Sequence, residues 1–277
     1  FEMRTSIDEG WMSESSSGSM TMRPASSCSR MLRSDRITVA TIPSRPRGRR
    51  ERYVPIMYNP PANRVEDLPA LHDLIEQAAF GHVISRSSDT FAASGLPLLL
   101  DRQTGDLGSL RGHFARANTQ WMQLDGEHVL VLVPLADGYA SPSWYPSKVD
   151  NPSVVPTWNY EVVHAHGVAR VHDDANWVRQ VVTELTDHHE SLRTDSAPVW
   201  ATNDAPEDFI DGQLRAVVGI GIEITRLEGK RKLSQNRGDA DRLGVIAGHE
   251  ASNAPQSAAL AAAMRQTERW SDTPPTQ

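Results

Sequence analysis

The spacing of hydrophobic residues divides the chain beyond residue 56 into helical and extended segments. Apolar side chains recur at helical intervals in residues 67–80 and 174–190, and Pro69 suits the first turn of the earlier segment. Residues 206–215 predict a third, short helix with Asp204 near its start as a candidate cap. Short segments bounded by Gly, Asp or Pro predict strands at 82–86, 91–100, 109–115, 129–134, 139–144, 157–172 and 217–227.

Residues 157–172 form the longest predicted strand. His164 and His166 fall on one of its faces and Ala165 on the other, and Gly167 indicates a bulge or a sharp bend. The predicted strands are closely spaced and lack regular βαβ alternation. The pattern therefore predicts a mainly β fold with flanking helices (α+β), built as a small closed antiparallel barrel.

Composition separates one predicted domain from the two ends of the chain. Residues 1–56 carry ten arginines, no lysine and six acidic residues, and their Ser-rich sequence without apolar period predicts a disordered tail. The remaining chain has a net charge of −11, a poor match for nucleic acid, so a nucleic-acid arm would have to lie in 1–56. Alternatively, residues 1–56 are not translated, and synthesis of the protein begins at Met57. We expect residues 57–248 to form one domain and residues 249–277 an Ala-rich tail, with a loose helix and a frayed end.

Composition and motifs exclude several classes of site. A single cysteine, Cys28, rules out a disulfide framework and a cysteine-based zinc site. No apolar run approaches the roughly 18 residues of a membrane span, so we expect a soluble cytoplasmic protein. No nucleophile motif such as G-x-S-x-G occurs, and catalytic residues stay unassigned. His164 and His166 have metal-binding spacing, with His172 on the same face, but no second His or Cys pair accompanies them, and we expect no metal.

Several polar segments together offer the chemistry that a flavin mononucleotide requires. Residues 111–118 combine a strand end with Arg116 and Asn118, which suits a phosphate. Residues 155–160 bring the flat ring of Trp158 beside hydrogen-bonding side chains, which suits a flavin ring. The chain has only three lysines against 25 arginines, and they lie in similarly polar segments: Lys148, Lys230 and Lys232.

Several motifs in a fixed order resemble one family. The segments LRGHFARAN, SPSWYPSK, VPTWNYEVVHAHG, LTDHHE and ITRLEGKRKLSQNR are similar to those of the PaiB-type FMN-binding negative transcriptional regulators. The resemblance runs from Met57 to about Gly248. It implies the split antiparallel β-barrel of the pyridoxamine 5′-phosphate oxidase-like flavoproteins. It also implies a homodimer that holds FMN at the subunit interface, where both chains touch it.

The resemblance implies specific roles for residues of this chain. The phosphate and ribityl chain would lie near the segment 111–118, with Lys148 as a second phosphate partner. The flavin ring would be bordered by Thr157, Trp158 and Asn159, and residues 232–236 would form a loop that closes the site. The cofactor-binding residues expected on this basis are Arg111, Gly112, His113, Arg116, Asn118, Lys148, Thr157, Trp158, Asn159, Lys232, Gln235 and Asn236.

Two positions depart from the pattern of the family. Many members have a histidine just before the Leu-Pro that corresponds to Leu96-Pro97, whereas Ser94 and Gly95 stand there in this chain. Arg231 occupies a position at which an aromatic or apolar residue is common. Both departures bear on the details of the pocket.

Three functions remain open from the sequence. The resemblance implies an FMN-binding regulator that acts on DNA directly or through a partner protein. The fold it implies also hosts flavin-dependent oxidoreductases, for which His113 and His164 are candidate acid–base residues. A haem-handling split barrel is the third reading, supported only by His164 and His166.

Overall fold

The computed structural model describes residues 57–267, so the expectations for residues 1–56 and for the end of the chain lie outside the described residues. The described part contains eight strands and five α-helices, joined by short 3-10 turns. The strands are β1 (Arg64–Val65), β2 (Phe80–Ser87), β3 (Thr90–Pro97), β4 (Leu99–Asp101), β5 (Ser109–Ala115), β6 (His128–Ala140), β7 (Thr157–His172) and β8 (Val217–Lys232). The helices are α1 (Leu68–Ala78), α2 (Ala175–Ser191), α3 (Glu207–Leu214), α4 (Asp239–Glu250) and α5 (Ser257–Gln266).

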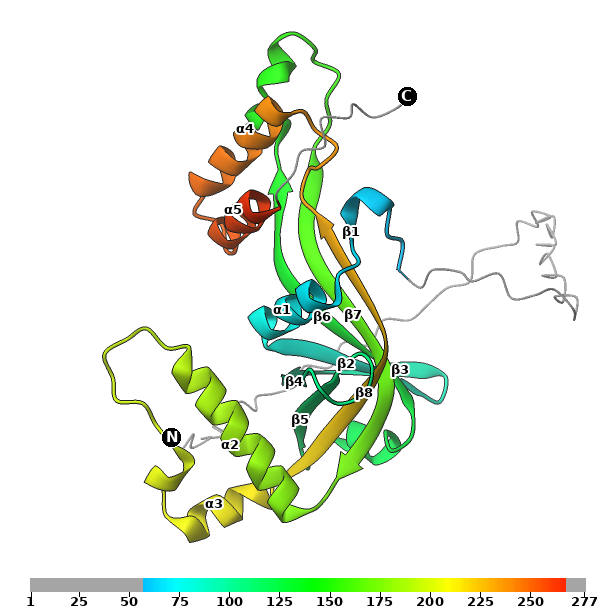
Figure 1. The fold of residues 1–277 in the computed structure, drawn as a ribbon, viewed down its shortest axis with the longest axis vertical. Coiled ribbons are helices and arrows are strands. Elements are labelled where there is room, and N and C mark those ends of the chain that lie inside the picture. The colour runs from blue at the N-terminus through cyan, green and yellow to red at the C-terminus, as the bar shows by residue number, and fades with distance from the viewer. Residues whose placement is uncertain (1–56, 268–277) are drawn as a thin grey trace, which may run out of the picture. The chain divides into compact units, whose positions relative to one another are not determined.

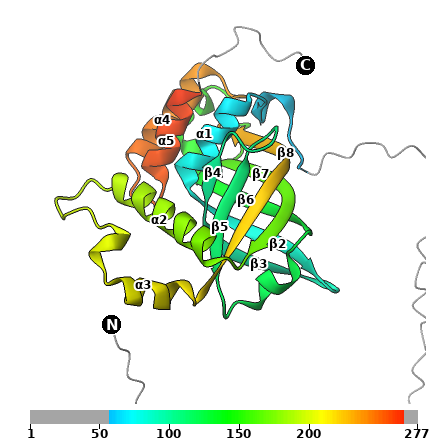
Figure 2. The same ribbon diagram turned by 60° about the horizontal axis from the view of Figure 1, so that its bottom comes forward.

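All strands belong to one antiparallel sheet that curls into an open barrel (Figures 1 and 2). The strand order is β3-β2-β6-β7-β8-β5-β4, with β1 paired to β8. The sheet thus has two edge strands, β3 and β4, which a single residue, Leu98, connects. The split barrel with flanking helices is confirmed, whereas the closed hydrogen-bonded barrel expected from strand spacing is wrong. Closure fails because no ladder joins the two edges of the sheet.

The three longest strands form the centre of the sheet. The pairing of β7 with β8 places Lys232 opposite Tyr160 at one end and Gly219 opposite His172 at the other. The register shifts after His166, which confirms the irregularity expected at Gly167. A side chain at Gly167 would meet the backbone oxygen of Glu223 at 2.4 Å, so the close approach of β8 requires a residue without Cβ.

Two helices follow their sequence signals closely. The carboxylate of Asp67 accepts a hydrogen bond from the backbone N–H of Ala70 at 3.0 Å and so caps α1. Asp174 caps α2 in the same way through the N–H of Trp177. Asp204, the expected cap of α3, instead accepts from the N–H of Ala201, one turn too early to serve that helix. None of the helices among residues 57–267 is long and apolar enough to cross a membrane.

Apolar side chains gather in two separate cores. The first core fills the barrel and includes the fully buried Phe114, Leu110 and Val131. The second core lies where α4 and α5 pack beside the far ends of β6 and β8 (Figure 1). It consists of Ala136, Ala140, Tyr145, Leu233, Val245, Ile246, Leu260, Ala261, Ala263 and Met264.

Helix α5 differs from the loose helix expected in the Ala-rich tail. Leu260 and Met264 are fully buried in the second core, and small alanines between them allow α5 to lie close against α4. The expected boundary at residue 248 falls inside α4, so the structure continues the packed domain to the end of α5.

Helix α4 also holds the turn that carries Lys148. The carboxylate of Asp241 accepts hydrogen bonds from the N–H and the hydroxyl of Ser147, at 3.0 and 2.7 Å. One turn further, Gly244 and Gly248 pack directly against the backbone and indole of Trp144. Because Gly244 and Gly248 carry no Cβ, residues 142–149 can pack directly against the backbone of α4.

The N-cap of α1 gives a modest, testable contribution to stability. Asp67→Ala should lower the free energy of unfolding by about 1 kcal/mol, because the first turn of α1 loses the acceptor for the N–H of Ala70. Urea denaturation measures this change. Asp89→Ala, at an exposed residue of the turn between β2 and β3, is the matched control and should leave the midpoint unchanged. Equal midpoints for the two variants would contradict the capping role.

Candidate functional site

An open groove of about 610 Å³ runs along the outer face of the central strands. Its walls come from the start of the described chain and from β6, β7 and β8. Tyr58, Trp158 and Tyr160 supply flat aromatic surface, while His164 and Lys230 supply polar groups. The volume lies in the range of small-molecule pockets, and the mixture of stacking surface and few polar groups is typical of nucleotide-like ligands.

Lys230 is the most buried cation of this groove, at 6% exposure. Its ammonium donates to the backbone carbonyl of Tyr58 at 2.8 Å. It also lies 5.3 and 5.2 Å from the ring centres of Tyr58 and Tyr160. These contacts fix the first described residues against β8, and they place a positive charge in the groove.

The structure brings three of the expected flavin residues together at one end of the groove. Trp158 is 52% exposed, and its indole N–H donates to Asp137 at 3.1 Å. The ammonium of Lys232 donates to the hydroxyl of Thr157 at 2.6 Å and to the carbonyl of Trp158 at 2.9 Å. An exposed indole face therefore stands beside a cation that the neighbouring strand holds in place.

Asn159 does not border this surface. It is fully buried on the opposite face of β7, where its amide oxygen accepts from the hydroxyl of Ser234 at 3.0 Å and its nitrogen faces the sulfur of Met264. The side chain of Asn159 thus lies away from the indole of Trp158, and its contact with a flavin ring stays a prediction. Successive side chains of a strand point to opposite faces, so Trp158 and Asn159 cannot both line the groove.

The other residues expected near this end have different surroundings. The amide of Gln235 bonds the N–H of Leu233 and the carbonyl of Arg231, so it shapes its own loop after β8. Asn236 is exposed in the same loop, and Lys148 is exposed in the turn held by α4. Neither residue lines the groove.

The expected phosphate segment lies on β5 and the turn that follows it. Arg111 pairs with Glu184 of α2 at 2.6 Å, while its Nε has no hydrogen-bond partner. His113 is half-buried on the same face, its Nδ1 is also unpartnered, and burial lowers its pKa. Gly112 points the other way, into the barrel, where a Cβ would meet the carbonyl of Pro97 at 2.8 Å. A ligand could reach the two side chains but not Gly112.

The end of this segment is already engaged within the chain. The guanidinium of Arg116 bonds the carboxylate of Asp173 and the carbonyls of Arg215 and Val217. The amide of Asn118 donates to the hydroxyl of Ser94 at 2.7 Å and caps the short turn after β5. A phosphate near Arg116 would have to compete with Asp173.

The two groups of expected cofactor residues stand at opposite ends of β8. β5 pairs with the first half of β8, with Arg111 opposite Gly221, whereas Tyr160 of β7 pairs with Lys232 at the other end. The strand between Gly221 and Lys232 spans about 36 Å at 3.3 Å per residue. This length exceeds that of an FMN molecule, so one protomer does not bring both groups to one flavin.

Both departures from the family pattern have a physical explanation. The ring of Phe80 covers Gly95, and a Cβ at Gly95 would lie 2.5 Å from that ring. A histidine at this position would therefore displace Phe80. Arg231 pairs at 2.5 Å with Glu161, whose side chain is 1% exposed, so the arginine compensates a buried carboxylate.

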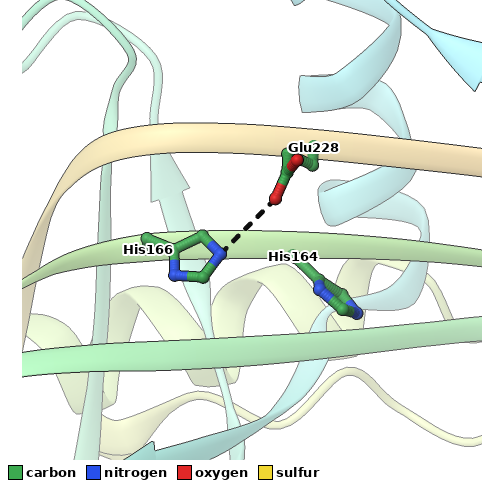
Figure 3. A group of neighbouring side chains, drawn as sticks. All are labelled: His164, His166 and Glu228. Carbon is green, nitrogen blue, oxygen red and sulfur yellow. Dashed lines mark ion pairs between the residues drawn. The ribbon is translucent and has the colours of Figure 1, made fainter. Parts of the chain in front are cut away.

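A second cluster of polar side chains lies beside the groove (Figure 3). His164 and His166 project from β7, and Glu228 reaches toward them from β8, directly opposite His164 in the register. The Nε2 of His166 lies 3.7 Å from a carboxylate oxygen of Glu228. Burial lowers the pKa of both imidazoles, which favours their neutral forms. Sequence reasoning missed Glu228 because only the strand register reveals it.

The groove fits a flavin in part. The exposed indole of Trp158 gives stacking surface, and His164 and the cation of Lys230 in the groove wall give polar groups. A flavin ring needs both. A phosphate would find no free cation among the residues that line the groove, because Lys230 already donates to the carbonyl of Tyr58.

Comparison of the sequence with known proteins shows that this chain is similar to FMN-binding domains. A family model described as "Putative FMN-binding domain" matches residues 57–226. The chain is 30% identical over 208 residues to the Protease synthase and sporulation protein PAI 2 of Bacillus subtilis, covering 74% of this chain and 96% of that protein. It is also 30% identical over 187 residues to the uncharacterized protein AN0679 of Emericella nidulans, covering 57% and 74% of the two chains.

Solved structures show a more distant likeness. The flavocytochrome Anf3 from Azotobacter vinelandii matches with a TM-score of 0.42 and 15% identity, over 61% of this chain and 68% of that one. The FAD and haem binding protein from Mycobacterium smegmatis matches with a TM-score of 0.42 and 16% identity, over 61% and 73%.

Proposed function

Since the chain belongs to the family of FMN-binding domains whose model spans residues 57–226, we propose that it is a homodimeric FMN-dependent regulator similar to PAI 2. FMN is the cofactor that the family supports. When bound, FMN supplies reversible electron transfer, which the protein tunes through contacts to the ring.

A dimer is supported by the distance between the two groups of expected cofactor-binding residues, which lie at opposite ends of β8. Arg111 and His113 at one end have unpartnered nitrogens, and Trp158 at the other end has an exposed ring. A second protomer that brings its β5 end to the groove of the first would complete one site from two chains. Each dimer would then hold two FMN molecules.

The outer face of the sheet also favours a second copy. Half-exposed apolar side chains share this face with His164, and the more exposed Phe80 and Phe91 extend it. Such a surface is too apolar to remain in water without cost. Those on the central strands are Ile84, Leu130, Leu132, Val162 and Val168.

Mixed dimers test the shared site. Arg111→Ala and Trp158→Ala should each weaken FMN binding about tenfold or more, because one removes a charged donor and the other a stacking face. Co-expression of the two variants with different tags yields mixed dimers that carry both defects in one site and none in the other. We expect these dimers to bind one FMN with normal affinity, measured by visible absorbance after gel filtration.

Control variants show whether a loss of FMN binding is specific to the two groups of residues. Arg193→Ala and Trp200→Ala change exposed residues outside both groups and away from the outer sheet face, and they should leave FMN binding unchanged. Mixed dimers without any normal site would refute the shared arrangement, because a site within one protomer would be defective in both chains. Normal FMN binding by both single variants would refute the assigned residues.

The regulatory role has its own test. The described domain lies within the part of the chain whose net charge is −11, which disfavours direct contact between that part and phosphate backbones. A band-shift assay of the full chain and of a chain that begins at Met57, each with and without FMN, separates direct DNA binding from action through a partner. A second candidate function, a flavin-dependent oxidoreductase, is favoured by the open groove beside Trp158. Sustained oxidation of reduced nicotinamide by the FMN-loaded protein would support that function instead.

A further inference from the structure

We infer that His164, His166 and Glu228 form a binding site for a divalent transition-metal ion such as Zn²⁺. One potential ligand atom from each residue lies within 4.8 Å of the others. Two imidazoles and one carboxylate are a donor set that zinc and other first-row metal ions accept, with further positions left for water or a ligand. The site does not depend on FMN, and it lies at the edge of the groove that His164 lines.

Unsatisfied polar atoms point to a ligand at this place. His164 Nδ1, His166 Nε2 and Glu228 Oε2 are all buried and have no hydrogen-bond partner. A buried polar atom without a partner destabilises the fold, and this cluster holds three of them. A single bound cation would satisfy all three, because each is a lone-pair donor.

The separations approach those of a metal site. Two ligands of a tetrahedral zinc ion lie about 3.4 Å apart when the bonds are near 2.1 Å. His166 Nε2 and Glu228 Oε2 are 3.7 Å apart, and all three ligand atoms lie within 4.8 Å of one another, so side-chain rotations would bring them onto one ion. Adjacent strands hold the ligands in register, and the second carboxylate oxygen of Glu228 accepts from Arg226 at 2.6 Å, which orients the group.

Two positively charged side chains near the site, Arg226 and Lys230, repel a metal ion, but each is hydrogen-bonded to an oxygen that is not one of the proposed ligand atoms. Arg226 bonds the far oxygen of Glu228, and Lys230 bonds the carbonyl of Tyr58 between two aromatic rings. Their charges lower the affinity for a metal without occupying its ligand atoms. Among residues 57–267, this is the cluster in which three or more potential ligand groups converge.

Zinc titration of the full chain tests the site. The protein is purified without a polyhistidine tag, treated with EDTA, and titrated with ZnCl₂ by calorimetry. Zinc content is then measured after gel filtration. We expect one ion per chain, and His166→Gln and Glu228→Gln should each weaken binding at least tenfold. The matched control is His189→Gln, in the neighbouring-histidine pair at the end of α2, which should bind zinc normally.

Every outcome bears on the inference. Failure of the unaltered chain to retain stoichiometric zinc, loss of binding only in His189→Gln, or unchanged affinity in both ligand variants would overturn it. Should the ligand variants unfold, X-ray absorption at the zinc edge of the unaltered protein decides. Two imidazole ligands with bonds near 2.0–2.1 Å support the site, and a shell of water alone refutes it. FMN content, recorded in parallel, reports separately on the proposed function.

Discussion

A chain that ends at residue 248 will lose its second core and aggregate or unfold at much lower temperature than the full chain. The cut removes α5 and with it Leu260 and Met264, both fully buried. Loss of two such side chains costs about 4–10 kcal/mol, which is comparable with the total stability of a typical domain. It also removes the backbone oxygens of Met264 and Thr267, which accept hydrogen bonds from the buried Arg242.

The matched control ends at Thr267 and keeps both helices. It should unfold at the same temperature as the full chain in differential scanning calorimetry. A milder variant, Leu260→Ala, should lower the free energy of unfolding by about 2–5 kcal/mol and keeps the experiment informative if the short chain does not express. A chain ending at residue 248 that unfolds at the temperature of the control would refute the structural role of α5.

Gly244→Ala will destabilise the protein although alanine is the better helix former. In an open helix the change would gain about 1 kcal/mol. At Gly244, however, the new Cβ would lie 2.0 Å from the backbone oxygen of Trp144, so α4 or residues 142–149 must move. Overpacking of this kind costs about 1–3 kcal/mol or more. Urea denaturation should therefore show a net loss.

The same substitution elsewhere provides a control of opposite sign. Gly212 lies inside α3, and a Cβ there would meet only the end of a flexible arginine side chain at 3.7 Å. Gly212→Ala should raise stability by up to about 1 kcal/mol. Stabilisation by both substitutions would show that α4 does not pack tightly on Trp144.

Local sequence patterns predicted most elements but not their partners. The helices near residues 67–80 and 174–190 and the bulge at Gly167 follow from short-range signals and are present in the structure, whereas the cap expected at Asp204 is not. The open edges of the sheet and the meeting of Glu228 with His164 depend on strand register, which no local pattern encodes. The cluster beside the groove therefore stayed incomplete at the sequence level.

Two differences between expectation and structure have different physical origins. Strand alternation alone places Asn159 on the face opposite Trp158, so the sequence contained the information that separates these two side chains. The packing of α5 was harder to predict. Its alanines give a weak contrast between the faces, and burial depends on α4 supplying a close partner.

The position of β8 has a consequence for synthesis on the ribosome. β8 is the last strand to be made, yet it lies between β7 and β5 in the sheet and also pairs with β1. Until residue 232 has emerged, the nascent chain can form only two separate ribbons, β3-β2-β6-β7 and β5-β4, each with an unpaired backbone edge. Such edges attract other strands, so chaperone capture before release should favour the yield of native protein.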